Sequence, residues 1–308
     1  MSAERKSPRG AGGIVDRARA ALLGVAVGDA LGATTEFMTP AQIRNRFGVL
    51  REIVGGGWLK LSPGQVTDDT DMTLCVARGI VGSDRWSLGP IADRFAYWLS
   101  GNPADVGATC RRGIEEYMAK GRLEAPPDEL GAGNGAAMRV APVALYTLGD
   151  EGLLSRLAVE QARITHHHPL SDAACVSVGT IIQRGILGAP LPGLRAAAED
   201  LAARHPEFRF EKYDGKSSAY VVDTLRTVFD AFFSTGSFED CIVKTVNRGG
   251  DADTTGSIVG AIAGARYGLA GIPQRWLQAL DPDLREELSA LGEELVRKSP
   301  MLTGSSPR

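Results

Sequence analysis

The sequence has little of several features that would narrow its function at once. Its 308 residues include four cysteines, which lie far apart without a C-x-x-C pair, so neither a zinc knuckle nor a redox pair is indicated. These cysteines are Cys75, Cys110, Cys175 and Cys241. There is no excess of positive charge either, because 34 basic residues stand against 37 acidic ones, for a formal charge of −3. This balance gives no electrostatic reason to expect nucleic acid as a partner.

Long apolar stretches are also scarce. The longest uncharged run, 254–265, is well short of the ~20 residues that a membrane-spanning helix needs. The first dozen residues lack the apolar core of a secretion signal. We therefore expect a cytoplasmic protein with no direct membrane insertion, which could still lie at the inner membrane through a partner.

Alternating strand patterns are nearly absent, whereas apolar residues recur at three- and four-residue steps along most of the chain. No stretch of flexible composition divides the sequence, and we expect disordered tails at 1–13 and 300–308. Helices are predicted at 14–31, 40–47, 91–99, 112–120, 151–164, 170–187, 194–204, 217–234, 238–246 and 281–298.

Two predicted helices carry glycine at every fourth position. The series are Gly24, Gly28 and Gly32 in the first, and Gly256, Gly260, Gly264 and Gly268 in the second. Residues four apart share a helix face, and each glycine costs about 1 kcal/mol relative to alanine, so we infer that two backbones cross closely there. Each helix would then deliver carboxylates at one end, with Glu36 after the first and Asp251 and Asp253 at the start of the second. Ordinary tight packing would account for the glycines but not for the acids.

A second cluster of acids, T-D-D-T-D, begins at Thr67 and precedes an apolar helical pattern. In the simpler interpretation, Thr67 caps the helix and the aspartates complement its dipole. A cap needs one acid, however, and this cluster has three.

The acid clusters together offer oxygen donors without thiolates or suitably spaced imidazoles. Such donors suit magnesium or manganese rather than zinc or copper. They would supply enough oxygens for two ions that share a bridging aspartate, and such ion pairs can orient a sugar or a phosphate and lower the pKa of water. An EF-hand calcium loop starting at Asp251 fails, because its twelfth position is Ile262 and not glutamate. The candidate ligands are Glu36, Thr67, Asp68, Asp69, Asp251, Asp253 and Thr254.

Three of the four histidines, His166, His167 and His168, are consecutive between two predicted helices. Consecutive side chains point in different directions, so we favour helix-terminus or substrate-contact roles over a metal site. Small residues around Asn134 and Arg139 indicate backbone that passes close to a ligand or to another helix.

Four motifs, in order along the chain, resemble the ADP-ribosylglycohydrolase family. They are G-V-A-V-G-D-A-L-G-A-T-T-E-F, V-T-D-D-T-D-M, G-N-G-A-A-M-R and V-N-R-G-G-D-A-D-T-T-G. The resemblance covers about residues 15 to 295 and is strongest to members that act on the nitrogenase iron protein. It implies an all-α, single-domain orthogonal bundle over 14–299, with a dinuclear metal cleft that holds two Mn²⁺ (or Mg²⁺) on the candidate ligands above.

The resemblance also implies roles for individual residues. Asp105 and Glu36 are the expected catalytic residues, with Asp105 in proton transfer, and Glu129, Asn134 and His166 are the expected substrate contacts. The implied reaction removes ADP-ribose from a modified arginine of a protein, here the nitrogenase iron protein, which regains activity. A PII-type regulatory protein and an ammonium channel at the membrane are implied as further partners.

Three alternatives stay open on the sequence. Another member of the family could act on ADP-ribosylated serine, ADP-ribose esters or modified nucleic acid. A non-catalytic, crystallin-like relative is a second alternative, although both acid clusters keep every acid. A dimetal phosphatase is the third, because oxygen-rich sites also accept phosphates.

Overall fold

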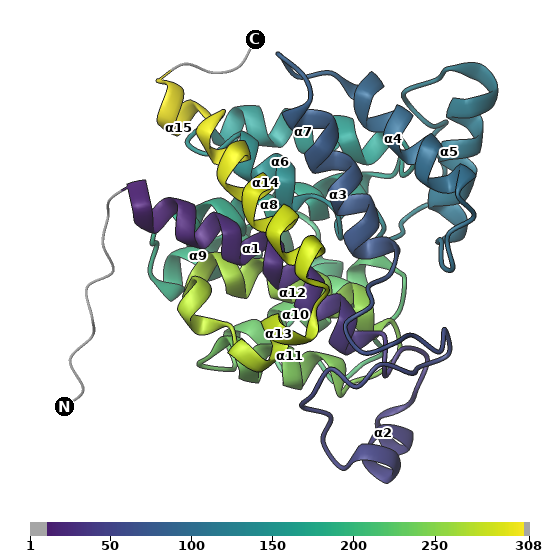
Figure 1. The fold of residues 1–308 in the computed structure, drawn as a ribbon, viewed down its shortest axis with the longest axis vertical. Coiled ribbons are helices and arrows are strands. Elements are labelled where there is room, and N and C mark those ends of the chain that lie inside the picture. The colour runs from purple at the N-terminus through teal and green to yellow at the C-terminus, as the bar shows by residue number, and fades with distance from the viewer. Residues whose placement is uncertain (1–10, 305–308) are drawn as a thin grey trace.

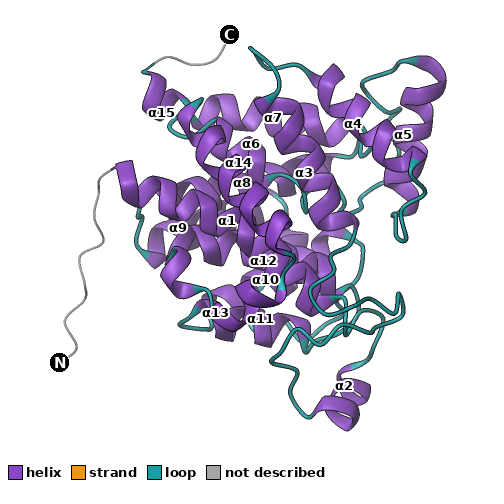
Figure 2. Cartoon of the chain, viewed as in Figure 1, coloured by secondary structure: helices purple, strands orange, loops and turns teal. Residues whose placement is uncertain are grey.

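The computed structural model describes residues 11–304, and helices make up most of them (Figure 1). Within this range there is no strand (Figure 2). Two isolated bridges pair Gly56 with Leu61 and Gly133 with Tyr220. The predicted all-α fold is therefore confirmed. The elements are α1 (Ala11–Gly32), α2 (Pro40–Phe47), α3 (Asp68–Val81), α4 (Leu88–Ser100), α5 (Ala108–Lys120), α6 (Ala141–Tyr146), α7 (Glu151–Arg163), α8 (Pro169–Ile186), α9 (Leu191–Arg204), η1 (Pro206–Phe208), α10 (Val221–Phe233), α11 (Phe238–Val246), α12 (Ala252–Tyr267), η2 (Leu269–Gly271), α13 (Gln274–Ala279), α14 (Pro282–Arg297) and α15 (Pro300–Thr303).

Helices α1 and α12 cross at the centre of the molecule, as the glycine series predicts (Figure 1). A Cβ added to Gly28 would overlap the carbonyl oxygen of Gly256, and one added to Gly24 would overlap that of Gly260. The facing positions run in opposite directions along the two helices. The C-terminal end of α1 therefore lies at the N-terminal end of α12, and this brings Glu36 to Asp251 and Asp253.

Helix α12 is buried from Ala252 to Ala265, as expected for a helix that is apolar on all sides. It also packs against α8, α10 and α11, while α14 covers α1 on the side facing the viewer in Figure 1. Helix α2 lies apart from this body, at the end of long loops. The rigid centre is therefore the α1–α12 pair, and the loops at its acidic end are the more open part of the fold.

The predicted helix at 217–234 is wrong at its start, because α10 begins at Val221. The carbonyl of Ser217 accepts a hydrogen bond from the backbone N–H of Asp251 (3.1 Å), and that of Ala219 accepts one from Asn134 (3.1 Å). These long-range bonds hold the segment as a loop beside the acidic end of α12. Helical periodicity carries no information about such partners.

The expected tails are also corrected where the structure describes them. Helix α1 begins at Ala11, and α15 lies within the segment expected to be disordered, where Met301 N–H donates to the carbonyl of Leu148 (2.9 Å). Residues 1–10 and 305–308 lie outside the described residues. Helices α6 and α13 were not predicted, since six residues are too few to show a periodic pattern. No helix in the described part of the chain is long and apolar enough to cross a membrane.

Candidate metal centre and substrate cleft

Three carboxylates meet where α1 ends and α12 begins. Glu36 follows α1, Asp251 is the N-cap of α12, and Asp253 lies in its first turn. One oxygen from each lies within 4.8 Å of the others, so the three could hold a metal ion. Glu36 and Asp253 are buried and Asp251 is partly buried. The glycine crossing is the cause of this grouping, because it sets the two helix ends side by side.

A pair of glycines fixes the loop that enters α12. Gly249 and Gly250 both have φ of 65°, in the left-handed region. A Cβ on Gly249 would overlap the carbonyl oxygen of Met38, and one on Gly250 would overlap that of Ser217. The loop is tied to the segment after Glu36 by two backbone bonds, from Phe37 N–H to Gly250 O (2.7 Å) and from Gly250 N–H to Met38 O (2.9 Å). Only glycine suits this close approach.

The second acid cluster joins the first through a side-chain hydrogen bond. Thr254 Oγ1 donates to Asp69 Oδ2 (3.1 Å), which connects the first turn of α3 to the first turn of α12. The other carboxylate oxygen, Asp69 Oδ1, is buried and has no hydrogen-bond partner among the described residues. Thr67 is both N-cap and cluster member, since its Oγ1 accepts from the backbone N–H of Asp69 (3.4 Å). Thr67 therefore does cap α3, but capping does not explain why Asp69 Oδ1 is buried without a hydrogen-bond partner.

Asp29 is a site residue that the sequence reasoning missed. It lies fully buried in α1, where its oxygens accept from the N–H of Thr67 (3.0 Å), the N–H of Thr70 (3.1 Å) and the hydroxyl of Thr70 (2.5 Å). Burial raises the pKa of Asp29 to about 6, although these hydrogen bonds oppose the shift. Asp29 therefore positions the start of α3 against α1. The signal for this role in the sequence is that Asp29 is a single acidic residue within the first glycine series.

Burial and mutual repulsion dominate the electrostatics of this centre. Burial is the largest cause that raises the pKa of Glu36 to about 8 and of Asp68 to about 7, and neighbouring carboxylates such as Asp105 add to both shifts. The pKa values of Asp69 and Asp253 are also raised well above the usual range, first by burial and then by nearby acids. No ion pair within residues 11–304 includes any of these acids. Buried carboxylates need a counter-charge, and hard oxygen donors with an unpartnered Asp69 oxygen fit a divalent cation.

A cavity of about 450 Å³ opens over this centre. The candidate residues that line it are Glu36, Asp68, Asp105, Asn134, His166, Asp251, Asp253 and Thr254. Asp105 comes from the loop before α5, and burial is the main cause that raises its pKa. Asn134 Nδ2 donates to Asp251 Oδ2 (2.7 Å) and to Thr224 Oγ1 (3.0 Å), so it orients a candidate ligand as well as lining the cavity.

Other expected residues lie elsewhere. Thr67 and Asp69 are buried behind the cavity wall and do not line it. Glu129 is exposed, on the loop before Asn134, and is not among the lining residues, so its contact with substrate stays a prediction. His168 is the N-cap of α8, where its Nδ1 accepts from Leu170 N–H (3.1 Å).

The position of the proton on His166 follows from its neighbours. Arg139 is fully buried and donates from Nη2 to Thr165 Oγ1 (2.8 Å), which lies 2.7 Å from His166 Nδ1. A guanidinium can only donate, so the Thr165 proton finds an acceptor only if His166 Nδ1 is unprotonated. His166 then carries its proton on Nε2 and lines the cavity as a donor. Burial, and next the charge of Arg139, lower the pKa of His166 to about 3, which keeps the ring neutral.

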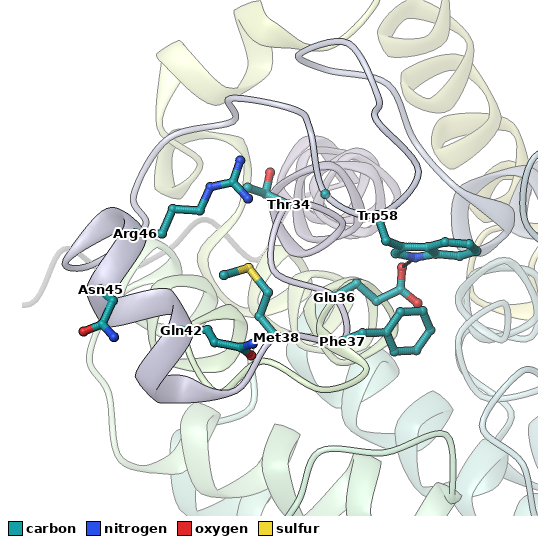
Figure 3. Close-up of a pocket in the computed structure, with 9 residues that line it drawn as sticks. Thr34, Glu36, Phe37, Met38, Gln42, Asn45, Arg46 and Trp58 are labelled. Atoms are coloured by element: carbon teal, nitrogen blue, oxygen red, sulfur yellow. Dashed lines mark hydrogen bonds between the residues drawn. The ribbon is translucent and has the colours of Figure 1, made fainter.

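A second, more open groove of about 620 Å³ adjoins the cleft on the side of α2 (Figure 3). Glu36 and Phe37 line both cavities and so form the wall between them. The indole Nε1 of Trp58 donates to Glu36 Oε2, which fixes the orientation of this carboxylate.

Comparisons with known proteins agree with one another. A family model described as ADP-ribosylglycohydrolase matches residues 12–303. The chain is 50% identical to the ADP-ribosyl-[dinitrogen reductase] glycohydrolase of Rhodospirillum rubrum, over 89% of this chain and 93% of that protein. It is 32% identical to the ADP-ribosylarginine hydrolase Tri1 of Serratia proteamaculans, over 93% of this chain and 80% of that protein. A solved ADP-ribosylglycohydrolase-related protein complex is similar with a TM-score of 0.83 and 37% identity, over 92% of this chain and 98% of that chain.

Proposed function

This chain belongs to the ADP-ribosylglycohydrolase family, and from that premise we propose that it is a hydrolase that removes ADP-ribose from a modified arginine of a protein. The relatives named for action on dinitrogenase reductase and on ADP-ribosylarginine support this substrate class. We propose dinitrogenase reductase, the nitrogenase iron protein, as the protein substrate. The observation that carries the proposal is the convergence of both acid clusters with Asp105 in one cavity.

We propose that the centre holds two Mn²⁺ (or Mg²⁺) ions. Glu36, Asp251 and Asp253 would hold one side, and the α3 cluster, joined to them through Thr254, would hold the other. When bound, such ions orient sugar oxygens and lower the pKa of water. The full set of seven ligands stays a prediction.

Asp105 is proposed to move the proton in the reaction. Water adds to the anomeric carbon of the ribose, the bond from this carbon to the arginine nitrogen breaks, and the leaving nitrogen gains a proton. Asp105 lines the same cavity as Glu36 and lies outside the group of carboxylates that could hold an ion. Burial is the main cause that raises the pKa of Asp105 above the usual value of an aspartate, and this shift favours the protonated form that a general acid needs.

His166 and Asn134 are proposed to position the substrate. The Nε2–H of His166 would donate to an acceptor oxygen of ADP-ribose, and its fixed, neutral state suits a donor and not a base. Asn134 would act mainly by holding Asp251. The PII-type protein and the ammonium channel stay predictions, because no contact surface for either follows from this geometry.

Release of ADP-ribose from ADP-ribosylated dinitrogenase reductase tests the proposal. The mass of the target arginine peptide is measured with and without Mn²⁺, for the wild type and for Asp105→Asn. We expect Mn²⁺-dependent release by the wild type and a loss of at least about 100-fold in the variant, the usual range for a lost general acid or base. Asp84→Asn, at an exposed aspartate outside the cleft, is the control and should keep full activity.

Three results would contradict parts of this proposal. A nearly normal rate in Asp105→Asn would remove Asp105 from the chemistry. Release from serine-linked protein without release from arginine-linked protein would mean that the substrate class is wrong. Absence of any release together with absence of Mn²⁺ binding would favour a non-catalytic relative.

A further inference from the structure

Phe37 has an unusual conformation at the wall between the two cavities. Its φ is 59°, in the left-handed region, which is unfavourable for a bulky side chain. The bond from its N–H to Gly250 O, next to Asp251, holds it there. The side chain is nevertheless 66% exposed, so burial of the ring does not offset the strain. Strained residues of this kind concentrate at functional sites, and here the result is an aromatic ring displayed beside Glu36.

Trp58 supplies a second aromatic surface at the same place. The rings of Phe37 and Trp58 have centroids 5.4 Å apart and planes tilted by 53°. The indole is 48% exposed, and its N–H is bound to Glu36. Figure 3 shows the Glu36 carboxylate beside the two rings. The two rings and this carboxylate therefore form one composite surface, open to the groove.

The chemistry of this surface suits a planar cation. Aromatic faces attract a guanidinium through their quadrupoles, and its planar, weakly hydrated charge stacks well on them. The proposed reaction has such a cation, because the arginine to which ADP-ribose is attached keeps its charge. Glu129, an acid expected to contact the substrate, does not line the cavity and so leaves this charge without an assigned partner there. The surrounding wall is rich in acids, which gives the cation charge complementarity.

Adenine is the other planar group of the substrate, and geometry disfavours it. Glu36 belongs to the group that could hold an ion, so the rings beside it lie next to the ribose that would be cleaved. The adenine is separated from that ribose by two phosphates and a second ribose. The groove beyond the rings is open, which leaves room for the polypeptide that carries the arginine.

We propose that Phe37 and Trp58 form the subsite for the guanidinium of the modified arginine and favour arginine-linked over uncharged leaving groups. This inference rests on the proposed function of the cleft. It assigns a specificity role to two exposed aromatic residues that lie outside both acid clusters.

Replacement of Phe37 by leucine or by tyrosine tests the subsite. Both side chains meet the same left-handed backbone, so strain is matched, but only tyrosine keeps an aromatic face. With arginine-linked substrate, we expect kcat/KM to fall roughly tenfold in Phe37→Leu, mainly through KM, and by less than about twofold in Phe37→Tyr. Inhibition by free ADP-ribose, which has no guanidinium, should show no such difference between the two variants.

The possible results distinguish failure of the proposed Phe37–Trp58 subsite from failure of the proposed hydrolase function. Equal rates in Phe37→Leu and wild type, or equal losses in both variants, would overturn the subsite. A tenfold weaker inhibition by ADP-ribose in Phe37→Leu would overturn it too and would assign the rings to adenine. A wild type that leaves arginine-linked substrate intact would overturn the proposed function, and the subsite with it.

Discussion

At the scale of single residues, buried polar groups set the chemistry of the cleft. Arg139 is fully buried and contacts Gln161, Thr165 and the face of Phe95, with its guanidinium carbon 4.7 Å from the ring centre. No ion pair in the described part of the chain includes Arg139. A buried cation of this kind is unfavourable unless each of its donors finds a partner. One of those partners is the Thr165 hydroxyl that fixes the tautomer of His166.

Thr165→Val should release this constraint with little change in shape. We expect the wild-type His166 to carry its proton on Nε2, and the variant to show a mixture of tautomers, because valine cannot donate to Nδ1. Two-dimensional ¹H–¹⁵N spectra of protein labelled at its four histidines distinguish the two forms.

The rate of turnover should depend on which nitrogen of His166 carries the proton. Loss of one oriented hydrogen bond predicts a fall in kcat/KM of roughly fivefold to tenfold in Thr165→Val. Thr165→Ser keeps the hydroxyl and should stay within about twofold of the wild type. A wild-type His166 protonated on Nδ1 would show that the hydrogen-bond assignment is wrong.

At the scale of elements, the crossing of α1 and α12 controls the site from a distance. The two backbones touch at glycines, so a single methyl group would separate the helices. Because Glu36 follows one helix and Asp253 lies in the first turn of the other, any separation also moves the candidate ligands apart. The stability and the metal site of this protein therefore depend on the same contact.

Gly28→Ala should demonstrate this dependence. Its Cβ would overlap the carbonyl of Gly256, and overpacking in a rigid core costs about 1–3 kcal/mol or more. Gly12→Ala is the matched control in the same helix, because the added Cβ has no packing neighbour within 4 Å among residues 11–304, apart from its own helix backbone. It should be neutral or stabilising by up to about 1 kcal/mol. Urea unfolding of both variants measures the difference, and equal stabilities would mean that the helices do not cross as closely as described.

At the scale of the whole molecule, metal binding and folding should be coupled. The acids of the centre come from three distant segments of the chain, so the unfolded chain lacks the site. An ion that binds the folded state alone stabilises it by about 2.7 kcal/mol at a hundredfold excess over Kd. We expect Mn²⁺ to raise the melting temperature by several degrees in the wild type, and much less in Asp253→Asn. No shift in the wild type would contradict a metal centre.

The shift should also depend on pH in a defined direction. The pKa values of Glu36 and Asp68 in the fold, about 8 and about 7, lie above those of the unfolded chain. The metal-free folded state therefore keeps protons that the unfolded state releases, and its stability falls as pH rises from about 4 to about 8. Divalent ions compete with these protons. The Mn²⁺-induced shift in melting temperature should be larger at pH 8 than at pH 6, and the reverse order would contradict this assignment.

Much of this protein could be predicted from its sequence, because the relevant signals are local. Apolar residues at helical spacing predicted the all-α fold, and the four-residue glycine series predicted the central crossing. The crossing, together with the acids at the ends of the two helices, predicted that Glu36, Asp251 and Asp253 lie close together. In each case one helix face or one helix end carries the signal, so neighbouring residues are sufficient.

Only the tertiary structure decided the features that depend on partners far along the chain. Three features depend on contacts between segments that are separated in the sequence: the hydrogen bonds of Asp29 to the start of α3, the loop before α10, and the tautomer of His166, which depends on the bond from Arg139 to Thr165. The position of Glu129 outside the cavity and the display of the Phe37 ring are of the same kind. The sequence by itself determined where most of the longer helices form and which helix ends bear acids, because backbone periodicity is local. The packing of those helices decided which side chains face one cavity, because that depends on the balance of many contacts at once.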